Sequence, residues 1–150
     1  LDKSYSCPEY SVSYPKNWRL DTSRQAAPAI FFFSPLENSQ DKFSENVNIM
    51  IQNLAGKHID LSAYKVISEN QVSTLGVNGK MIKSKIEKTA QGDRYYMEYQ
   101  MTMNGNELRV KSVCYIKKDI AYLTTFTSKT DSFEKYNKTG TEILESFRLK

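Results

Sequence analysis

The sequence predicts an α+β fold built on an antiparallel β-sheet meander, with helices covering both faces of the sheet. Ten Tyr and seven Phe residues favour sheet, because aromatic residues are enriched in strands. Residues 77–128 read as four successive strands joined by tight turns, with Asn104-Gly105 at their centre. An Asn-Gly pair between two strand-like runs is a strong hairpin signal, since a type I′ turn needs positive φ at both central residues.

Length and composition indicate one soluble domain spanning residues 1–150. A hydrophobic fraction of 39% and a charged fraction of 25% are ordinary for a globular protein. The net charge of +4 is spread along the chain, which suits solubility as well as an anionic partner. No apolar run is long enough to span a bilayer. Because the chain begins at Leu1, we expect an extracytoplasmic protein, periplasmic or anchored by a lipid upstream of this segment.

The N-terminal third is expected to contribute three strands. Residues 1–8 read as a loose lead-in, and the first strand should stop at Pro15. Trp18, in the turn that follows, either caps an edge of the core or stacks on a ligand. A polar loop is expected at 36–45. The predicted strands span residues 9–14, 29–33 and 46–53.

Two helices flank the meander in the predicted order. The first is expected at 61–73, because the Asp60 carboxylate can accept the unpaired N–H groups of a first helical turn. The second is expected at 132–145, where Gly140 on the apolar stripe would allow close approach to the sheet at some cost in helix propensity. We also expect Thr130 or Asp131 to cap the N-terminus of this second helix, and residues 146–149 to form a short closing strand.

The register of the meander follows from its central turn. If Asn104-Gly105 is a two-residue loop, Tyr99 faces Val110 and the neighbouring pairs on that side are also apolar. The alternation of side chains agrees with the turn, which supports this register. One face of the sheet should therefore be apolar along its length and belong to the core.

The other face of the meander should combine charged and aromatic side chains. A turn near residues 91–93 would place Lys85 opposite Glu98, and Lys111 would continue the row on the next strand. A large aromatic cluster should not all face water, so either a helix covers it or it is a binding surface. The candidate binding surface comprises Tyr96, Tyr115, Tyr122 and Phe126, with Lys85, Lys111 and Arg109 nearby.

The two cysteines, Cys7 and Cys114, leave two alternatives open. In an exported chain they could form a disulfide that closes a loop of roughly a hundred residues. Otherwise they are separate thiols, with Cys114 buried in a strand.

No catalytic or metal-binding motif is present, and no cofactor is expected. His58 is the only histidine and lies in a connector with no nucleophile motif nearby. Glu37, Asp41 and Glu45 share the polar loop, where they either form a carboxylate site or are simply solvated. Nucleic acid is not an expected partner, because acidic residues such as Glu98 dilute the basic field of the meander.

Five segments, taken in order, resemble the PsbP-like superfamily. The opening Tyr10-Ser-Val-Ser-Tyr-Pro-Lys-Asn-Trp18 is similar to the superfamily's start, with Asn17 where Gly is common. The resemblance implies an αβα sandwich. The superfamily includes the extrinsic PsbP subunit of photosystem II, a Ran-binding Mog-type factor, bacterial lipoproteins and chaperones for secreted effectors. The remaining matching segments are Phe32-Phe-Ser-Pro35, Asn46-Val-Asn-Ile49, residues 121–128 and residues 143–148.

The resemblance implies a function in binding or assembly, with no catalytic residues to carry over. We therefore expect a non-catalytic extracytoplasmic module, monomeric or homodimeric, whose partner is a protein. Two alternatives remain: a dimeric intracellular chaperone that cradles an apolar helix of a secreted client, and a hydrolase that uses the loop at residues 37–45.

Overall fold

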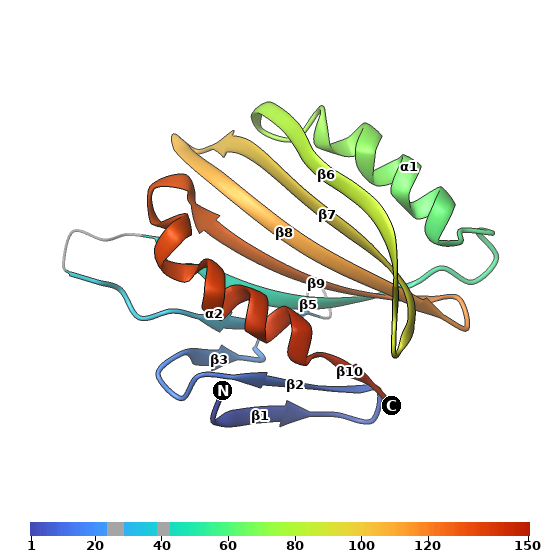
Figure 1. Cartoon of the computed structure of the whole chain (residues 1–150), viewed down its shortest axis with the longest axis horizontal. Helices are drawn as coiled ribbons and strands as arrows, with labels where there is room; N and C mark the ends of the chain where they lie inside the picture. The colour runs from blue at the N-terminus through green and yellow to red at the C-terminus, as the bar shows by residue number, and fades with distance from the viewer. Residues whose placement is uncertain (24–28, 39–42) are drawn as a thin grey trace.

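The computed structural model describes residues 1–23, 29–38 and 43–150, which form two antiparallel sheets and two α-helices (Figure 1). The larger sheet has seven strands in the order β3-β4-β5-β9-β8-β7-β6, and the smaller sheet has the order β1-β2-β10. The predicted α+β antiparallel fold is confirmed. The elements are β1 (Lys3–Ser6), β2 (Tyr10–Tyr14), β3 (Arg19–Asp21), β4 (Ala29–Phe33), β5 (Asn46–Asn53), α1 (Leu61–Val72), β6 (Val77–Thr89), β7 (Gly92–Met103), β8 (Asn106–Lys117), β9 (Ile120–Lys129), a 3₁₀ turn (Thr130–Ser132), α2 (Phe133–Ser146) and β10 (Arg148–Leu149).

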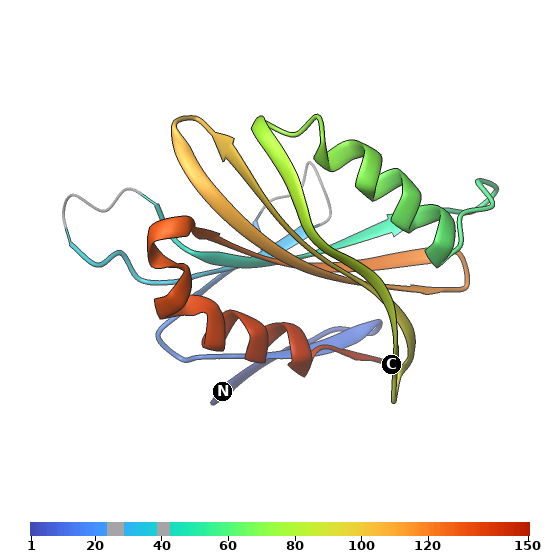
Figure 2. The same cartoon turned by 45° about the horizontal axis from the view of Figure 1, so that its top comes forward.

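The two helices lie on opposite faces of the seven-stranded sheet (Figure 2). Helix α1 packs on β6 and β7, whereas α2 packs on β9, β5 and β8 and also contacts β2 of the small sheet. One face is therefore covered by α1, and the other by α2 together with the small sheet. Within the described ranges, no helix is both long enough and apolar enough to cross a bilayer.

The central hairpin has the predicted turn and register. Asn104 and Gly105 adopt φ of 52° and 80°, as a type I′ turn requires. Tyr99 pairs with Val110, and Met103 pairs with Asn106. Each side chain of the hairpin therefore lies on the face that the sequence predicts.

The predicted pairing of Lys85 with Glu98 is wrong by two residues. Lys83 pairs with Glu98, and Lys85 pairs with Tyr96. The turn is formed by the two residues before Gly92, which opens β7 with φ of 108°. The Thr89 hydroxyl accepts a hydrogen bond from the backbone N–H of Gln91 (3.1 Å), which supports the earlier turn.

The predictions for the ends of the elements are partly confirmed. Asp60 caps α1 as expected, its Oδ1 accepting from the N–H of Ala63 at 2.8 Å. Helix α2 instead begins after a 3₁₀ turn, with Ser132 at the N-cap and no side-chain cap bond. Residues 1–8 are not a loose lead-in, because Lys3–Ser6 forms β1 and pairs with β2.

Helix α2 approaches the sheet closely at Gly140. A Cβ atom at this position would lie 2.6 Å from ring atoms of Phe126 on β9, whose side chain is fully buried. Ordinary carbon–carbon contacts are about 3.5–4.0 Å, so only glycine allows this approach. The expected role of Gly140 is confirmed.

Of the two alternatives for Cys7 and Cys114, the disulfide is not formed. Both thiols are free. Cys7 packs against the core cluster beneath α2, whereas Cys114 belongs to the cluster beneath α1, on the other face of the sheet. The alternative of two separate thiols, with Cys114 buried, is therefore correct.

Candidate functional site

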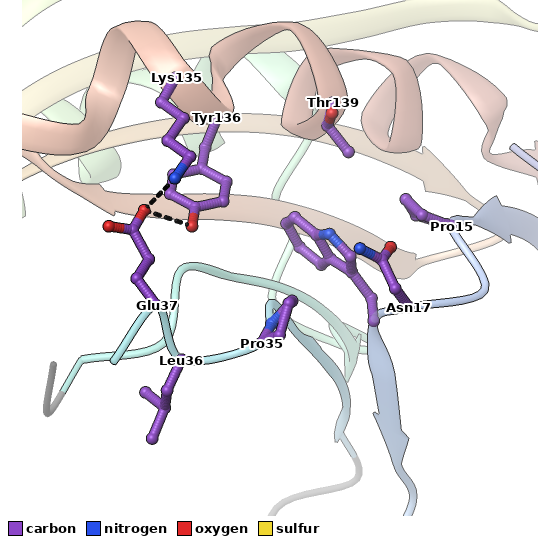
Figure 3. Close-up of a pocket in the computed structure, with 9 residues that line it drawn as sticks. Pro15, Asn17, Pro35, Leu36, Glu37, Lys135, Tyr136 and Thr139 are labelled. Atoms are coloured by element: carbon purple, nitrogen blue, oxygen red, sulfur yellow. Dashed lines mark hydrogen bonds and ion pairs between the residues drawn. The ribbon is translucent and has the colours of Figure 1, made fainter. Parts of the chain in front are cut away.

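A pocket in the described part of the chain lies where the small sheet meets α2. It has a volume of about 450 Å³ and is open to solvent. Three segments surround it: the turn between β2 and β3, the segment after β4, and the first turns of α2 (Figure 3). The lining residues are Pro15, Asn17, Trp18, Pro35, Leu36, Glu37, Lys135, Tyr136 and Thr139.

One wall of the pocket is the turn from Pro15 to Trp18. The N–H of Trp18 donates to the carbonyl of Pro15 at 3.0 Å, and the N–H of Lys16 donates to Asp2 Oδ1 at 2.8 Å. Trp18 is 6% exposed, and its ring meets the edge of the Tyr136 ring with centroids 6.5 Å apart. These contacts hold an aromatic wall in place before any partner arrives.

The opposite wall is the segment from Ser34 to Glu37. The N–H of Ser34 donates to the carbonyl of Glu45 at 2.8 Å, which fixes the chain after β4. Leu36 follows and is 55% exposed, which is high for a large apolar side chain. Its side chain points away from Lys135 and Tyr136 of α2 (Figure 3), so this apolar group lies beside the pocket on the outer side of the segment.

An ion pair closes one rim of the pocket. Lys135 Nζ donates to Glu37 Oε1, and the Tyr136 hydroxyl donates to the same oxygen at 2.9 Å (Figure 3). Both donors belong to α2, so the rim links this helix to the segment after β4. The rim is polar while the walls are mostly aromatic and aliphatic, a combination typical of recognition sites.

The charged groups of the pocket lining are paired with one another. This lining contains no Cys or His, and its carboxylate, Glu37, is held by Lys135 and Tyr136. Among the residues the structure describes, no group of three His, Cys, Asp or Glu side chains is placed to hold a metal ion. What the arrangement offers is a recess lined by aromatic, aliphatic and neutral polar side chains, with a charged edge.

The predicted aromatic binding surface is wrong in its main part. Tyr115, Tyr122 and Phe126 are 3%, 7% and 0% exposed, and they belong to the core cluster beneath α2. Tyr115 and Tyr122 also pack around Phe147, which follows α2. The helix and the small sheet cover these rings, which is the alternative that the sequence left open.

The charged part of that predicted surface forms a polar network at the edge of α2. Glu98, 4% exposed, accepts from Arg109 Nε and the Tyr96 hydroxyl, both at 3.0 Å. Burial raises the pKa of Glu98, but the bonds from Arg109 and Tyr96 outweigh it and hold this pKa below its ordinary value. Lys85 stays exposed, with its Nζ 5.7 Å from the centre of the Tyr96 ring.

Lys111 lies in the same network but meets only neutral oxygens. Its Nζ donates to Asn137 Oδ1 at 3.0 Å and to Thr141 Oγ1 at 2.8 Å, both on α2. Burial lowers the pKa of Lys111, the negative charge of Glu98 opposes this shift, and the positive charges of Lys83 and Arg109 lower the pKa further. Lys111 is therefore a buried cation that helps to seat α2 on the sheet.

The carboxylates of the polar loop do not come together as a site. Glu45 is 2% exposed and accepts from the Ser128 hydroxyl at 3.2 Å and the N–H of Lys129 at 3.0 Å, which is a structural role. Glu37 lies at the pocket rim, and Asp41 lies outside the described residues. His58 is exposed in the connector before α1 and does not line the pocket.

Sequence reasoning named Trp18 as a possible ligand-stacking residue but missed most of the pocket. Leu36 lies in what reads as a polar loop, and Tyr136 reads only as part of a buried helical stripe. One feature of the sequence could have located the pocket: the two segments that end in Trp18 and Pro35 both match the PsbP-like pattern. These two segments meet at the pocket.

Comparison with solved structures finds the same fold in several bacterial proteins. Cyanobacterial PsbP (CyanoP) from Synechocystis sp. PCC 6803 matches with a TM-score of 0.72 and 14% identity, over 99% of this chain and 92% of that one. LpqN from Mycobacterium tuberculosis, described as involved in cell envelope biogenesis, matches with a TM-score of 0.68 and 11% identity, over 98% and 90%. PA94 from Pseudomonas aeruginosa matches with a TM-score of 0.66 and 15% identity, over 95% and 94%.

At these identities the structural matches establish the fold alone. No curated protein matches the sequence. The family model for PsbP, however, matches residues 3–149, nearly the whole chain. The chain therefore belongs to the PsbP family.

Proposed function

We propose that this protein is a non-catalytic, extracytoplasmic binding or assembly module that docks a protein partner at the pocket beside Trp18. The observation that carries the proposal is the pocket itself: a preformed aromatic wall, the exposed side chain of Leu36 and a charged rim. Membership of the PsbP family supports a role in binding.

The dimensions of the pocket suit part of a protein surface. A recess of about 450 Å³ accommodates one or two large side chains. Interface energy is concentrated in a few apolar or aromatic anchors surrounded by polar groups that exclude water. An apolar anchor from the partner would contact Trp18, and the surrounding partner surface would cover the exposed Leu36 beside the pocket, while Lys135 and Glu37 would form the polar edge.

The extracytoplasmic location is part of this proposal and needs its own test. It is supported by the similarity to LpqN, which is described as involved in cell envelope biogenesis. Fractionation of the native source cells, with protease treatment of intact cells or spheroplasts, should recover the protein outside the cytoplasm. Recovery in the cytoplasmic fraction would remove this part of the proposal.

Photocrosslinking in the source organism tests the docking site. A photoreactive residue at position 36 should crosslink to one protein, whereas the same residue at position 66 should not. Val66 on α1 is the matched control, because it is also apolar and also 55% exposed but lies on the other side of the sheet. Crosslinks of equal yield and identity at both positions would contradict the proposal.

A further inference from the structure

A second surface on this molecule carries more positive charge than its carboxylates balance. It lies on the face of β6, β7 and β8 beside α2, and we call it the basic face: Lys83, Arg109 and Lys111 around Glu98. The register places Lys83 and Lys111 directly on either side of Glu98, one on each neighbouring strand. Three cations therefore surround one carboxylate.

The Glu98 carboxylate already has hydrogen-bond partners. Glu98 accepts hydrogen bonds from Arg109 and from the Tyr96 hydroxyl. Lys111 donates only to the neutral oxygens of Asn137 and Thr141. The described residues provide no ion-pair partner for Lys83, which is exposed on β6.

The positive charges of the basic face lie where solvent is partly excluded. Lys111 is 9% exposed, and Glu98 is 4% exposed. Charges interact more strongly where water is partly excluded. Burial lowers the pKa of Lys111 and the Glu98 carboxylate raises it, while the neighbouring positive charges of Lys83 and Arg109 act with burial. An added negative charge would oppose the effect of these positive charges.

Protection of the sheet edge explains only part of this arrangement. Edge strands often carry lysines that discourage pairing with other chains, and β6 is an edge strand with Lys80, Lys83, Lys85 and Lys88. Arg109 and Lys111, however, lie on β8, which is paired on both sides. Their charges cannot protect an edge.

We propose that the basic face docks an acidic segment of a protein partner, with a carboxylate of that segment lying against Lys83 and Arg109 within the field of Lys111. Charge complementarity identifies this occupant, because the only carboxylate at the centre of the face is already bonded. The inference is separate from docking at the pocket and holds whether or not the pocket is occupied.

Two charge reversals on one strand test this proposal. Lys83→Glu lies on the basic face, whereas Lys88→Glu lies on the opposite face of β6, where Lys88 pairs with Asp93. Each substitution lowers the net charge from +4 to +2, so the two proteins differ only in where the charge is lost. The probe is a fluorescein-labelled decaglutamate peptide, followed by anisotropy at low salt.

The chain should bind the peptide, and binding should weaken as salt rises. K83E should weaken binding about tenfold, while K88E should leave it within about twofold, since a positioned charge outweighs a distant one. In NMR titrations, the bound peptide should raise the pKa of the Lys111 ammonium. No binding, equal weakening by both variants, or binding only to phosphatidylglycerol vesicles would overturn the proposal.

Discussion

Replacement of Gly140 by alanine is the sharpest test of how α2 is seated on the sheet. The new Cβ would lie 2.6 Å from two ring atoms of Phe126 and 2.7 Å from a third. Normal contacts are about 3.5–4.0 Å, so about 1 Å of space is missing. Phe126 is fully buried and packs against Phe133 with ring centroids 6.2 Å apart, so its ring has little room to move.

Two opposing effects set the magnitude. Alanine gains about 1 kcal/mol of helix propensity over glycine. Overpacking of a filled core costs typically about 1–3 kcal/mol. We expect Gly140→Ala to lower the free energy of unfolding by about 1–2 kcal/mol, because the neighbouring ring cannot give way. For a chain of this size the melting temperature should fall by roughly 5 °C.

Chemical denaturation of four proteins measures this effect: wild type, G140A, F126A and the double variant. An alanine at position 126 removes the Cγ and Cδ ring atoms that the new Cβ at position 140 would meet. The cost of G140A should therefore be smaller in the F126A background, which a double-mutant cycle reports as a favourable coupling. A G140A protein as stable as wild type, or an equal cost of G140A in both backgrounds, would show that contact with Phe126 does not restrict position 140.

Three further predictions concern single buried groups. Thr124→Val should raise the free energy of unfolding by about 1 kcal/mol, because the buried Thr124 hydroxyl has no hydrogen-bond partner among the described residues. The matched change Thr125→Val should be destabilising, since the Thr125 hydroxyl is hydrogen-bonded. In the native protein a thiol reagent at pH 8 should modify the partly exposed Cys7 and spare Cys114 until unfolding, because burial raises the pKa of Cys114 to about 12. The pKa of Glu98 is lowered in the folded state, so its contribution to stability is present above pH 4.5 and is lost as pH falls below that value. In Glu98→Gln, the free energy of unfolding measured by denaturation should therefore fall less steeply as the pH is lowered below 4.5.

The meander was predictable because local sequence determines its central turn. Asn104 and Gly105 both adopt positive φ, and their turn fixes a register with which the alternation of side chains agrees. The turn predicted near residues 91–93 instead comes just before Gly92. A glycine with positive φ can open a strand as readily as form a turn, so its position alone does not locate the turn.

The small sheet and the pocket depend on contacts that local sequence does not show. Strand β1 is short and largely exposed, so its pairing with β2 leaves little hydrophobic pattern. Leu36 and Tyr136 are a hundred residues apart in the sequence and line the same pocket only because α2 returns to β2. The same long-range packing covers the aromatic cluster that alternation places on one face of the meander.

The most direct test of the proposed docking site uses Trp18, the only tryptophan in the chain. Labelling with 5-fluorotryptophan gives a single fluorine signal at one wall of the pocket. On addition of the partner identified by crosslinking, we expect this signal to shift, and we expect Leu36→Asp to abolish the shift while Val66→Asp preserves it. Full binding of the partner with an unchanged fluorine signal, and with no loss of affinity in L36D, would show that the partner does not dock at this pocket.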